Sequence, residues 1–302
     1  AGFFPVSLLL FVPLVFAGDQ LFPWLKGPWG AHPEIWLKPT RVFVSNGLGL
    51  VAVFAVAGSF VYHRLRSLAG TAEQAQSVQT LSRLAPVLFI VYALAFSLLA
   101  FDLFMALDPH WYSTLFGGYF FFGGLYAGLA WLAVLAVLLF RAQPTRALIG
   151  PSYLHPLGKL LFGFAMFHGM LFYSQYLPIW YANLPEEIEF VIVRTHEGPW
   201  PVVSLAFLLA SLLLPFSILL SRSVKEHPPA LAGVALLVLA GMWLDKFVLI
   251  VPSLWHEHTV PFGWLEAAIT AGFAGLVLLC YWAFSRFFPL VHHPPAHPSP
   301  HH

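Results

Sequence analysis

Eight apolar segments, most of them twenty or more residues long, constrain the fold of this chain more than any other feature. The segments are apolar on every face rather than on one, which is typical of helices surrounded by lipid. Strands of a transmembrane barrel would instead alternate apolar and polar residues. Because helices satisfy their backbone hydrogen bonds internally, the sequence predicts an all-α, polytopic transmembrane helical bundle. The expected spans are about 3–24, 41–62, 84–107, 115–140, 157–180, 200–220, 229–252 and 263–286.

The composition indicates the same class and excludes several functions. Hydrophobic residues make up 59% of the 302 positions and charged residues only 9%, which is too apolar for a soluble domain. A formal charge of +1 disfavours a nucleic-acid partner, and the single Cys280 excludes disulfides, thiolate zinc sites and Cys-ligated iron–sulfur clusters within the chain. We expect residues 1–290 to form one transmembrane domain in the lipid bilayer, followed by a disordered His/Pro-rich tail at 291–302.

Lys and Arg are distributed unevenly between the two sides of the predicted bundle. Nine of the 14 lie in the loops 63–83, 141–159 and 221–228 or at the end of the last span, and four lie on the opposite side. Cytoplasmic loops carry the excess of positive charge, so we expect the first side to be cytoplasmic. Both ends of the chain then lie inside, and the segment 180–187 lies outside.

Polar side chains inside the predicted spans are the candidates for function, because they are costly in lipid. Asp102 and Asp245 each lie seven residues before a proline near the outer end of a span, about 10 Å deep by helical rise. His168 lies about 18 Å in from Trp180, and Gln175 lies between them, nearly on the face of His168. Groups at graded depth suit proton movement. Alternatively, each carboxylate is bound to a neighbouring group and only fixes helix packing.

Other polar residues have more specific expectations. Lys246 points about 100° away from Asp245 on a helix, so we expect it to pair with another carboxylate or to reach toward the surface, and we count it with the proton-path candidates. His168 is the only deep histidine, so neither a haem nor a metal site is expected in this chain. Four residues outside the spans are candidates for quinone binding or for docking of partner proteins: Asp108, His110, Glu186 and Glu187.

Five segments carry motifs that resemble a known family: 101–102, 108–114, 157–160, 174–187 and 243–245. Together they are similar to the ActF-type membrane subunit of alternative complex III, a NrfD/PsrC-like protein of a quinol:electron-acceptor oxidoreductase. Members of this family have about ten spans, with two four-helix bundles at the core. Because the first span here resembles the third span of the family, the resemblance implies that the first bundle is incomplete. Lys246 and Met242 depart from the family pattern.

The resemblance also implies partners and a location. The complex would lie in a bacterial inner membrane and contain a paralogous NrfD-like subunit, iron–sulfur and multihaem cytochrome c subunits, and in some forms a terminal oxidase. Iron–sulfur clusters and c-type haems would then belong to the partners, with no cofactor in this chain and quinol as its candidate ligand. Three functions stay open: a proton-conducting subunit using Asp102, His168 and Asp245, a direct quinone-binding subunit, and a purely structural anchor for the electron-transfer subunits.

Overall fold

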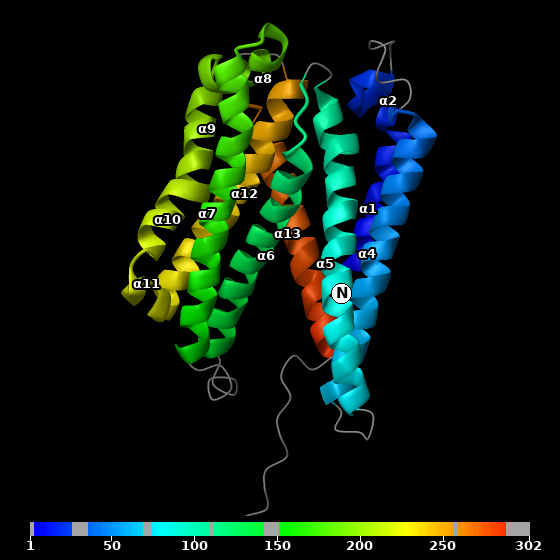
Figure 1. The fold of residues 1–302 in the computed structure, drawn as a ribbon, viewed down its shortest axis with the longest axis vertical. Helices are drawn as coiled ribbons and strands as arrows, with labels where there is room; N and C mark the ends of the chain where they lie inside the picture. Colours follow the sequence, from blue (N-terminus) through cyan, green and yellow to red (C-terminus); the bar gives the residue numbers. More distant parts are fainter. Residues whose placement is uncertain are drawn as a thin grey trace, which may run out of the picture. The chain divides into compact units, whose positions relative to one another are not determined.

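All regular structure in the described part of the chain is helical. The computed structural model describes residues 3–25, 36–68, 74–108, 111–141, 151–255, 259–261 and 263–287 (Figure 1). Seven of its helices are long and apolar enough to cross a membrane, and an eighth, at residues 4–16, is apolar but shorter. The chain is therefore an all-α polytopic membrane protein with about eight spans, as the sequence predicts.

The helices follow one another in the order labelled in Figure 1. They are α1 (Phe4–Phe16), α2 (Gly18–Leu21), η1 (Pro23–Leu25), α4 (Pro39–Leu68), α5 (Gln74–Leu99), η2 (Ala100–Phe104), η3 (Met105–Leu107), α6 (Phe116–Arg141), α7 (Pro151–Ala182), α8 (Pro185–His196), α9 (Trp200–Leu208), η4 (Leu209–Leu213), α10 (Leu214–Leu219), α11 (Arg222–Glu226), α12 (Pro228–Leu254) and α13 (Trp264–Phe287). The predicted first span, 3–24, is too long: α1 ends at Phe16, and the separate short helices α2 and η1 follow it. The predicted tail at 291–302 lies outside the described residues.

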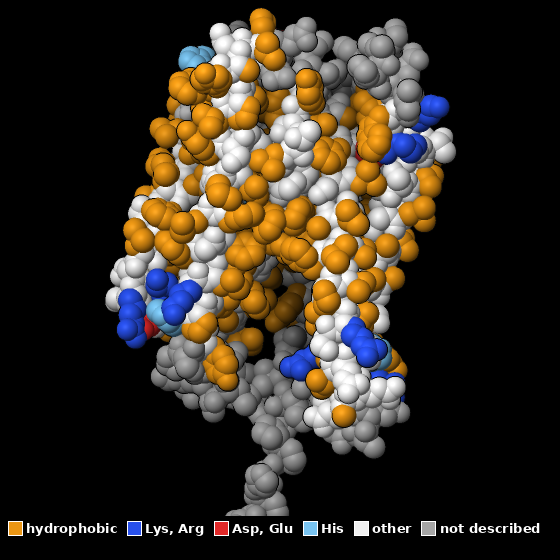
Figure 2. All heavy atoms as spheres, viewed as in Figure 1, with side chains coloured by type: hydrophobic (Ala, Val, Ile, Leu, Met, Phe, Trp, Pro, Cys, Tyr) orange, Lys and Arg blue, Asp and Glu red, His pale blue; other side chains and the backbone are white. Residues whose placement is uncertain are grey.

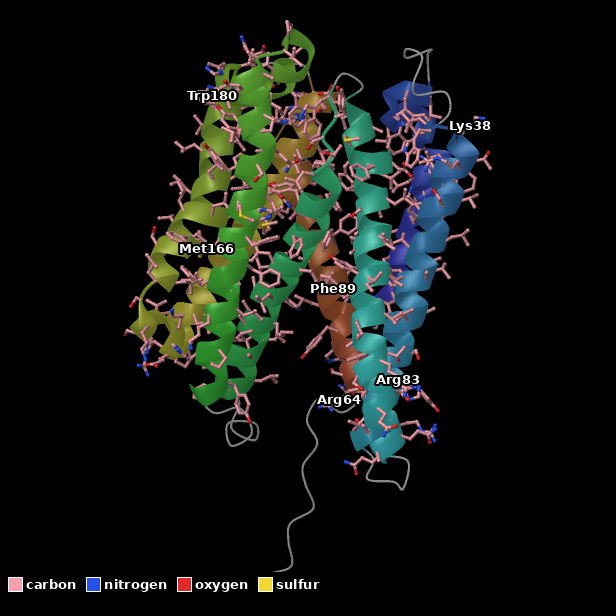
Figure 3. All side chains as sticks on the ribbon, in the orientation of Figure 1. Lys38, Arg64, Arg83, Phe89, Met166 and Trp180 are labelled. Carbon is pink, nitrogen blue, oxygen red and sulfur yellow. The ribbon has the colours of Figure 1, made fainter. Side chains whose placement is uncertain are left out.

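The chain divides into two compact units, which are described separately. The first comprises residues 1–13, 50–91 and 262–302, and the second comprises 14–49 and 92–261. In the first unit the ring of Phe4 stacks on Phe54, with 4.6 Å between ring centroids, which joins α1 to α4. Arg64 and Arg83 lie at the same end of this unit in Figure 3, and the apolar Phe89 lies farther along α5. Its basic side chains thus gather at one end, as expected of helices whose middle lies in lipid.

Helix α12 is the centre of the second unit. It packs against α6, α7 and α9 as well as α10 and α11. Its buried residues recur every three or four positions, so one face of the helix points into the unit throughout: Leu231, Val234, Ala235, Val238, Gly241, Met242, Asp245, Val248 and Pro252. Gly241 is required there, because a Cβ would overlap backbone atoms of Ala210 and Ser211 in η4.

The surface of the second unit has the character expected in a bilayer. Apolar side chains cover the length of its helices in Figure 2, whereas basic side chains gather around α11 and, at the other end, beside Lys38, which Figure 3 labels. Met166 is 52% exposed at mid-length of α7, and Trp180 is 61% exposed near its end (Figure 3). Exposed apolar residues at mid-helix and Trp near the end match a helix that faces lipid along its length and reaches the headgroups at Trp180.

Two spans contain a π-helical turn, a feature often found near functional sites. The first, η2, carries the fully buried Asp102, and the second, η4, carries the fully buried Ser211. The Ser211 carbonyl accepts a hydrogen bond from the Tyr126 hydroxyl at 3.0 Å. Pro215, four residues after Ser211, has no N–H to donate to that carbonyl, so the tyrosine supplies the missing donor.

Candidate functional site

A buried carboxylate, Asp245, forms the centre of the candidate site. Its side chain is 1% exposed and lies on the inward face of α12. One carboxylate oxygen accepts a short hydrogen bond from the Tyr119 hydroxyl of α6, and the other lies 2.8 Å from Lys246 Nζ. A charged group in a span needs such partners, because burying a charge without them would cost roughly several kcal/mol of stability.

The Lys246 side chain bends back to Asp245, and its Nζ lies over two aromatic rings. Its Nζ lies 4.5 Å from the ring centroid of Phe120 and 5.4 Å from that of Tyr119. The prediction that Lys246 pairs with another carboxylate or extends to the surface is therefore wrong. The lysine stem is long enough to bridge the 100° between adjacent helix positions, and the two rings stabilise the ammonium by cation–π contact.

His168 lies beside this group, on α7. Its ring stacks on Tyr119, with centroids 4.6 Å apart and planes 17° apart, and lies 5.7 Å from the ring of Tyr126. The side chain is 1% exposed, and neither ring nitrogen has a hydrogen-bond partner among the described residues. The structure therefore brings His168 and Asp245 into contact with the same tyrosine, one at its ring and the other at its hydroxyl.

Asp245 also lines a pocket of about 390 Å³ formed by α6, α7, α8, α9 and α12. The walls are mainly apolar, with many aromatic side chains, and they include Trp111, whose indole N–H has no partner among the described residues. Gln175, Arg194, Thr195 and Ser204 are further polar residues of the lining. A pocket of this size, apolar with a few convergent polar groups, is the usual form of a site for a small organic ligand.

Arg194 closes the α8 side of this pocket. Its side chain is only 6% exposed. The guanidinium donates to the carbonyls of Val248 and Leu249 at 2.9 Å each, to the Phe190 carbonyl, and to Ser253 Oγ. Pro252 cannot donate to the Val248 carbonyl, so the guanidinium takes that role. Burial lowers the pKa of Arg194 to about 9, against the opposing effect of the Asp108 carboxylate, so the side chain stays charged at neutral pH.

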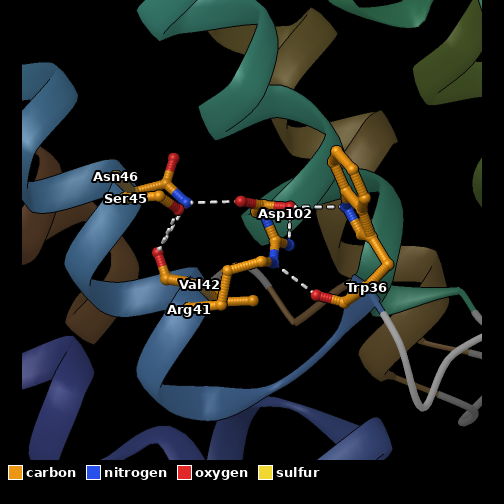
Figure 4. Close-up of polar contacts among 6 residues, drawn as sticks. All are labelled: Trp36, Arg41, Val42, Ser45, Asn46 and Asp102. Atoms are coloured by element: carbon orange, nitrogen blue, oxygen red, sulfur yellow. Dashed lines mark hydrogen bonds and ion pairs between the residues drawn. The ribbon is translucent and has the colours of Figure 1, made fainter.

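The second predicted carboxylate, Asp102, occupies a different environment (Figure 4). Its Oδ1 accepts hydrogen bonds from Trp36 Nε1 at 2.9 Å and from Arg41 Nη2 at 2.6 Å. Its Oδ2 accepts one from Asn46 Nδ2 at 2.7 Å. Asp102 is 0% exposed and does not line the pocket. Arg41 and Asn46 both come from α4, so this carboxylate fastens the start of α4 to η2.

The chain matches no protein-family model, and no curated protein is significantly similar to it. The site therefore rests on its own geometry, and the resemblance to the alternative complex III subunits stays a hypothesis.

The predicted residues within the spans divide into two groups in the structure. Asp245, Lys246, His168 and Gln175 meet at or beside the pocket, whereas Asp102 is bound by other residues. Asp102 does not line the pocket that contains Asp245. Trp36, together with Arg41 and Asn46 of α4, supplies Asp102 with a set of donors of its own.

The outer candidates remain predictions. Asp108 directly follows η3 and is half-buried. Its charge acts to raise the pKa of Arg194. His110 lies outside the described residues. Glu186 and Glu187 lie in the first turn of α8, but their side chains are outside the described part of the structure.

Several residues of the site were not predicted from the sequence: Tyr119, Trp36, Arg41, Asn46 and Arg194. Tyr119 reads as one more aromatic residue in a run that also contains Phe120. The two arginines read as loop charges. A usable signal existed for Arg194, because it is the only Lys or Arg between 183 and 199 and the span at 229–252 ends at Pro252, which leaves the carbonyl of Val248 without a donor.

Proposed function

We propose that this chain is an integral membrane subunit of a quinol-oxidising respiratory complex of the alternative complex III type, in which it relays protons while partner subunits carry electrons. The observation that carries the proposal is Asp245, a carboxylate buried in a span that nevertheless lines a pocket. A carboxylate that reaches a pocket on one side and a lysine on the other can take up a proton and pass it inward.

The motif resemblance supports the rest of the proposal. It supplies the partners: a paralogous NrfD-like subunit and subunits with iron–sulfur clusters and c-type haems. On this proposal the membrane is the bacterial inner membrane, both ends of the chain are cytoplasmic, and the α8 end of the pocket faces outside. The tight Asp245–Tyr119 contact and the nearby His168 would then form the outer half of a proton route.

The proposal is tested by Asp245→Asn in the purified complex, reconstituted into vesicles and supplied with quinol. We expect the number of protons moved per electron to fall while electron transfer continues, because Asn cannot hold the proton. Arg222→Ala, at the exposed end of α11, is the matched control and should leave the ratio unchanged. An unchanged ratio in Asp245→Asn, with the subunit assembled, would remove the proton-relay proposal and favour a structural anchor.

A second candidate is that this chain binds the quinol itself. The pocket favours it, because a flat ring fits between aromatic walls and its hydroxyl groups could meet Asp245, Gln175 or the unpartnered Trp111 N–H. A photoactivatable quinone should then label peptides within 172–179 and 190–195. Leu208→Trp, which fills the pocket, should abolish this labelling, whereas Val202→Trp, 74% exposed on the same helix, should not. Labelling confined to other subunits would exclude this candidate.

A further inference from the structure

The residues that line the pocket differ in exposure from one side of it to the other. Tyr119 of α6 and Asp245 of α12 are buried. On the other helices, Leu208 of α9 is half-buried, Thr195 of α8 is exposed, and Tyr173 of α7 is 57% exposed. The pocket is therefore closed at the back by α6 and α12 and reaches the surface of the unit at α7, α8 and α9.

The packing of α9 bounds this opening. Helix α9 packs against α12, and α8 packs against both α7 and α9 at their ends (Figure 1). Deeper in the unit, α9 meets α7 at the rings of Phe172 and Phe207, whose centroids lie 5.6 Å apart. Because Tyr173 and Leu208 lie on these two helices, the opening lies between α7 and α9, with α8 at its outer edge.

The depth of the opening places it among lipid chains. Tyr173 precedes Trp180 by seven residues on α7, so it lies roughly 10 Å deeper by helical rise. The exposed Trp180 marks the headgroup level. Met166 and Met170, farther along the same helix, are exposed and apolar, as expected of a surface in contact with lipid. A molecule that enters through this opening therefore comes from the bilayer rather than from water.

The charges of the lining favour an uncharged ligand. Among the described residues that line the pocket, only Asp245 and Arg194 are charged. Asp245 lies 2.8 Å from Lys246 Nζ, and Arg194 donates to backbone carbonyls of α12. Since each charge already has partners, a phosphate or an ammonium group would be desolvated here without gaining a free counter-charge. A hydroxyl group needs no counter-charge and can still donate a hydrogen bond to the carboxylate.

The size of the pocket limits how much of the ligand it holds. Its volume of about 390 Å³ is near the lower end of the range for ligand pockets, about 300–1,000 Å³. We propose that the pocket takes the uncharged, hydroxyl-bearing head group of a membrane-dissolved amphiphile through the opening between α7 and α9, while the hydrocarbon chain stays among the lipids. A quinol and a monoacylglycerol share this chemistry. The inference goes beyond the proposed function, because it does not require Asp245 to relay protons.

Three photoreactive probes test the class of ligand. They share an alkyl chain that carries a diazirine and differ only in the head group, which is a quinol, a glycerol or a phosphate. Each is photolysed with the complex in phosphatidylcholine nanodiscs, with and without an excess of its unlabelled form. With the quinol probe, the glycerol probe or both, we expect the excess to lower labelling at Tyr173 and Leu208 severalfold. Labelling at Met166, which does not line the pocket, should stay unchanged.

The set of probes that is displaced identifies the source of the ligand. Displacement of the quinol probe alone indicates a quinol, and displacement of the glycerol probe indicates a neutral lipid. No displacement with any probe would show that Tyr173 and Leu208 make only ordinary lipid contacts, and the inference is overturned. Displacement of the phosphate probe as strongly as the others would overturn the preference for an uncharged head group.

A matched pair of variants tests the position of the opening. Leu208→Trp narrows it and should lower the displaceable labelling at Tyr173 severalfold. Leu205→Trp places the same residue three positions earlier on α9, at an exposed site outside the lining, and should leave the labelling unchanged. An equal loss in both variants, or none in Leu208→Trp, would contradict the assigned opening. Because the readout is binding, an unchanged ratio of protons to electrons in Asp245→Asn would refute the proposed function without affecting this result.

Discussion

Asp102 and Asp245 are both aspartates buried in a span, yet their surroundings give them different capacities. Asp102 accepts hydrogen bonds from Trp36, Arg41 and Asn46, which occupy both of its oxygens. Asp245 has a tyrosine hydroxyl and a lysine as partners and also lines a pocket. Asp102 does not line the pocket, whereas Asp245 does and could exchange a proton with it. Burial alone therefore does not identify a relay residue; access does.

The largest effect is expected when the cation beside Asp102 is removed. Arg41→Met leaves a fully buried carboxylate without its charged partner, which should lower the free energy of unfolding by about 3 kcal/mol. Thermal unfolding of the purified protein in detergent measures it. Lys246→Met offers the comparison at Asp245, and a larger loss there than in Arg41→Met would reverse the assignment of structural and functional roles.

Asp102→Asn should have a smaller effect on stability. The amide keeps the shape of the side chain, and Arg41, with 28% of its side chain exposed, can be solvated, so we expect a loss of about 2 kcal/mol. The ratio of protons to electrons in vesicles should stay at the wild-type value. A fall in that ratio comparable to that in Asp245→Asn would place Asp102 on the proton route and cancel the contrast between the two aspartates.

Single hydrogen bonds to each carboxylate provide a matched pair of variants. Asn46→Ala and Tyr119→Phe each remove one donor to a buried carboxylate, which should lower the free energy of unfolding by about 1–3 kcal/mol in both. Only Tyr119→Phe should also slow proton uptake, because its partner Asp245 lines the pocket from which the proposed relay takes up a proton, whereas Asp102 does not. Stopped-flow measurement of proton uptake with a pH-sensitive dye distinguishes them. Equal slowing in both variants would contradict this expectation.

The smallest effect is expected for an ion pair in water. Arg222 Nε lies 2.7 Å from Glu226 Oε1 on α11. The hydrogen bond from Arg222 holds the pKa of Glu226 below its ordinary value. Any stabilisation by this pair is therefore present above the ordinary pKa of Glu226 and is lost as the pH falls through its lowered pKa. Exposed pairs are screened, so Arg222→Ala should leave the midpoint of thermal unfolding unchanged at neutral pH. A measurable drop would show that α11 contributes more than its exposure suggests.

The sequence predicts the spans well because each span depends on local composition. Seven of the eight predicted segments coincide with long apolar helices, and the exception is the first, where α1 is short. The depths of Asp245 and His168 are predicted from helical rise, and in the structure both residues contact Tyr119. These features depend on residues close in the chain, which is why patterns alone were sufficient.

The partners of the buried charges could not be predicted, because they come from distant parts of the chain. Tyr119 and Asp245 are 126 positions apart, and Arg41 and Asp102 are 61 apart. Arg41 and Arg194 were counted as loop charges when the orientation was predicted, but one pairs with Asp102 and the other is buried against α12. Without these two, the predicted outer side carries still fewer basic residues in its loops, so the predicted charge asymmetry becomes larger.

The contact between Arg194 and α12 has a consequence for how the second unit is assembled. Helix α8 precedes α12 in the chain, so during synthesis the guanidinium has no carbonyl groups of Val248 and Leu249 to bind. Until α12 enters the bilayer, the charge of Arg194 favours keeping α8 in the aqueous layer. Insertion of α12 presents the carbonyl that Pro252 leaves without a donor, and α8 can then fold down onto it. The α8 side of the pocket can therefore be closed only after α12 is in place.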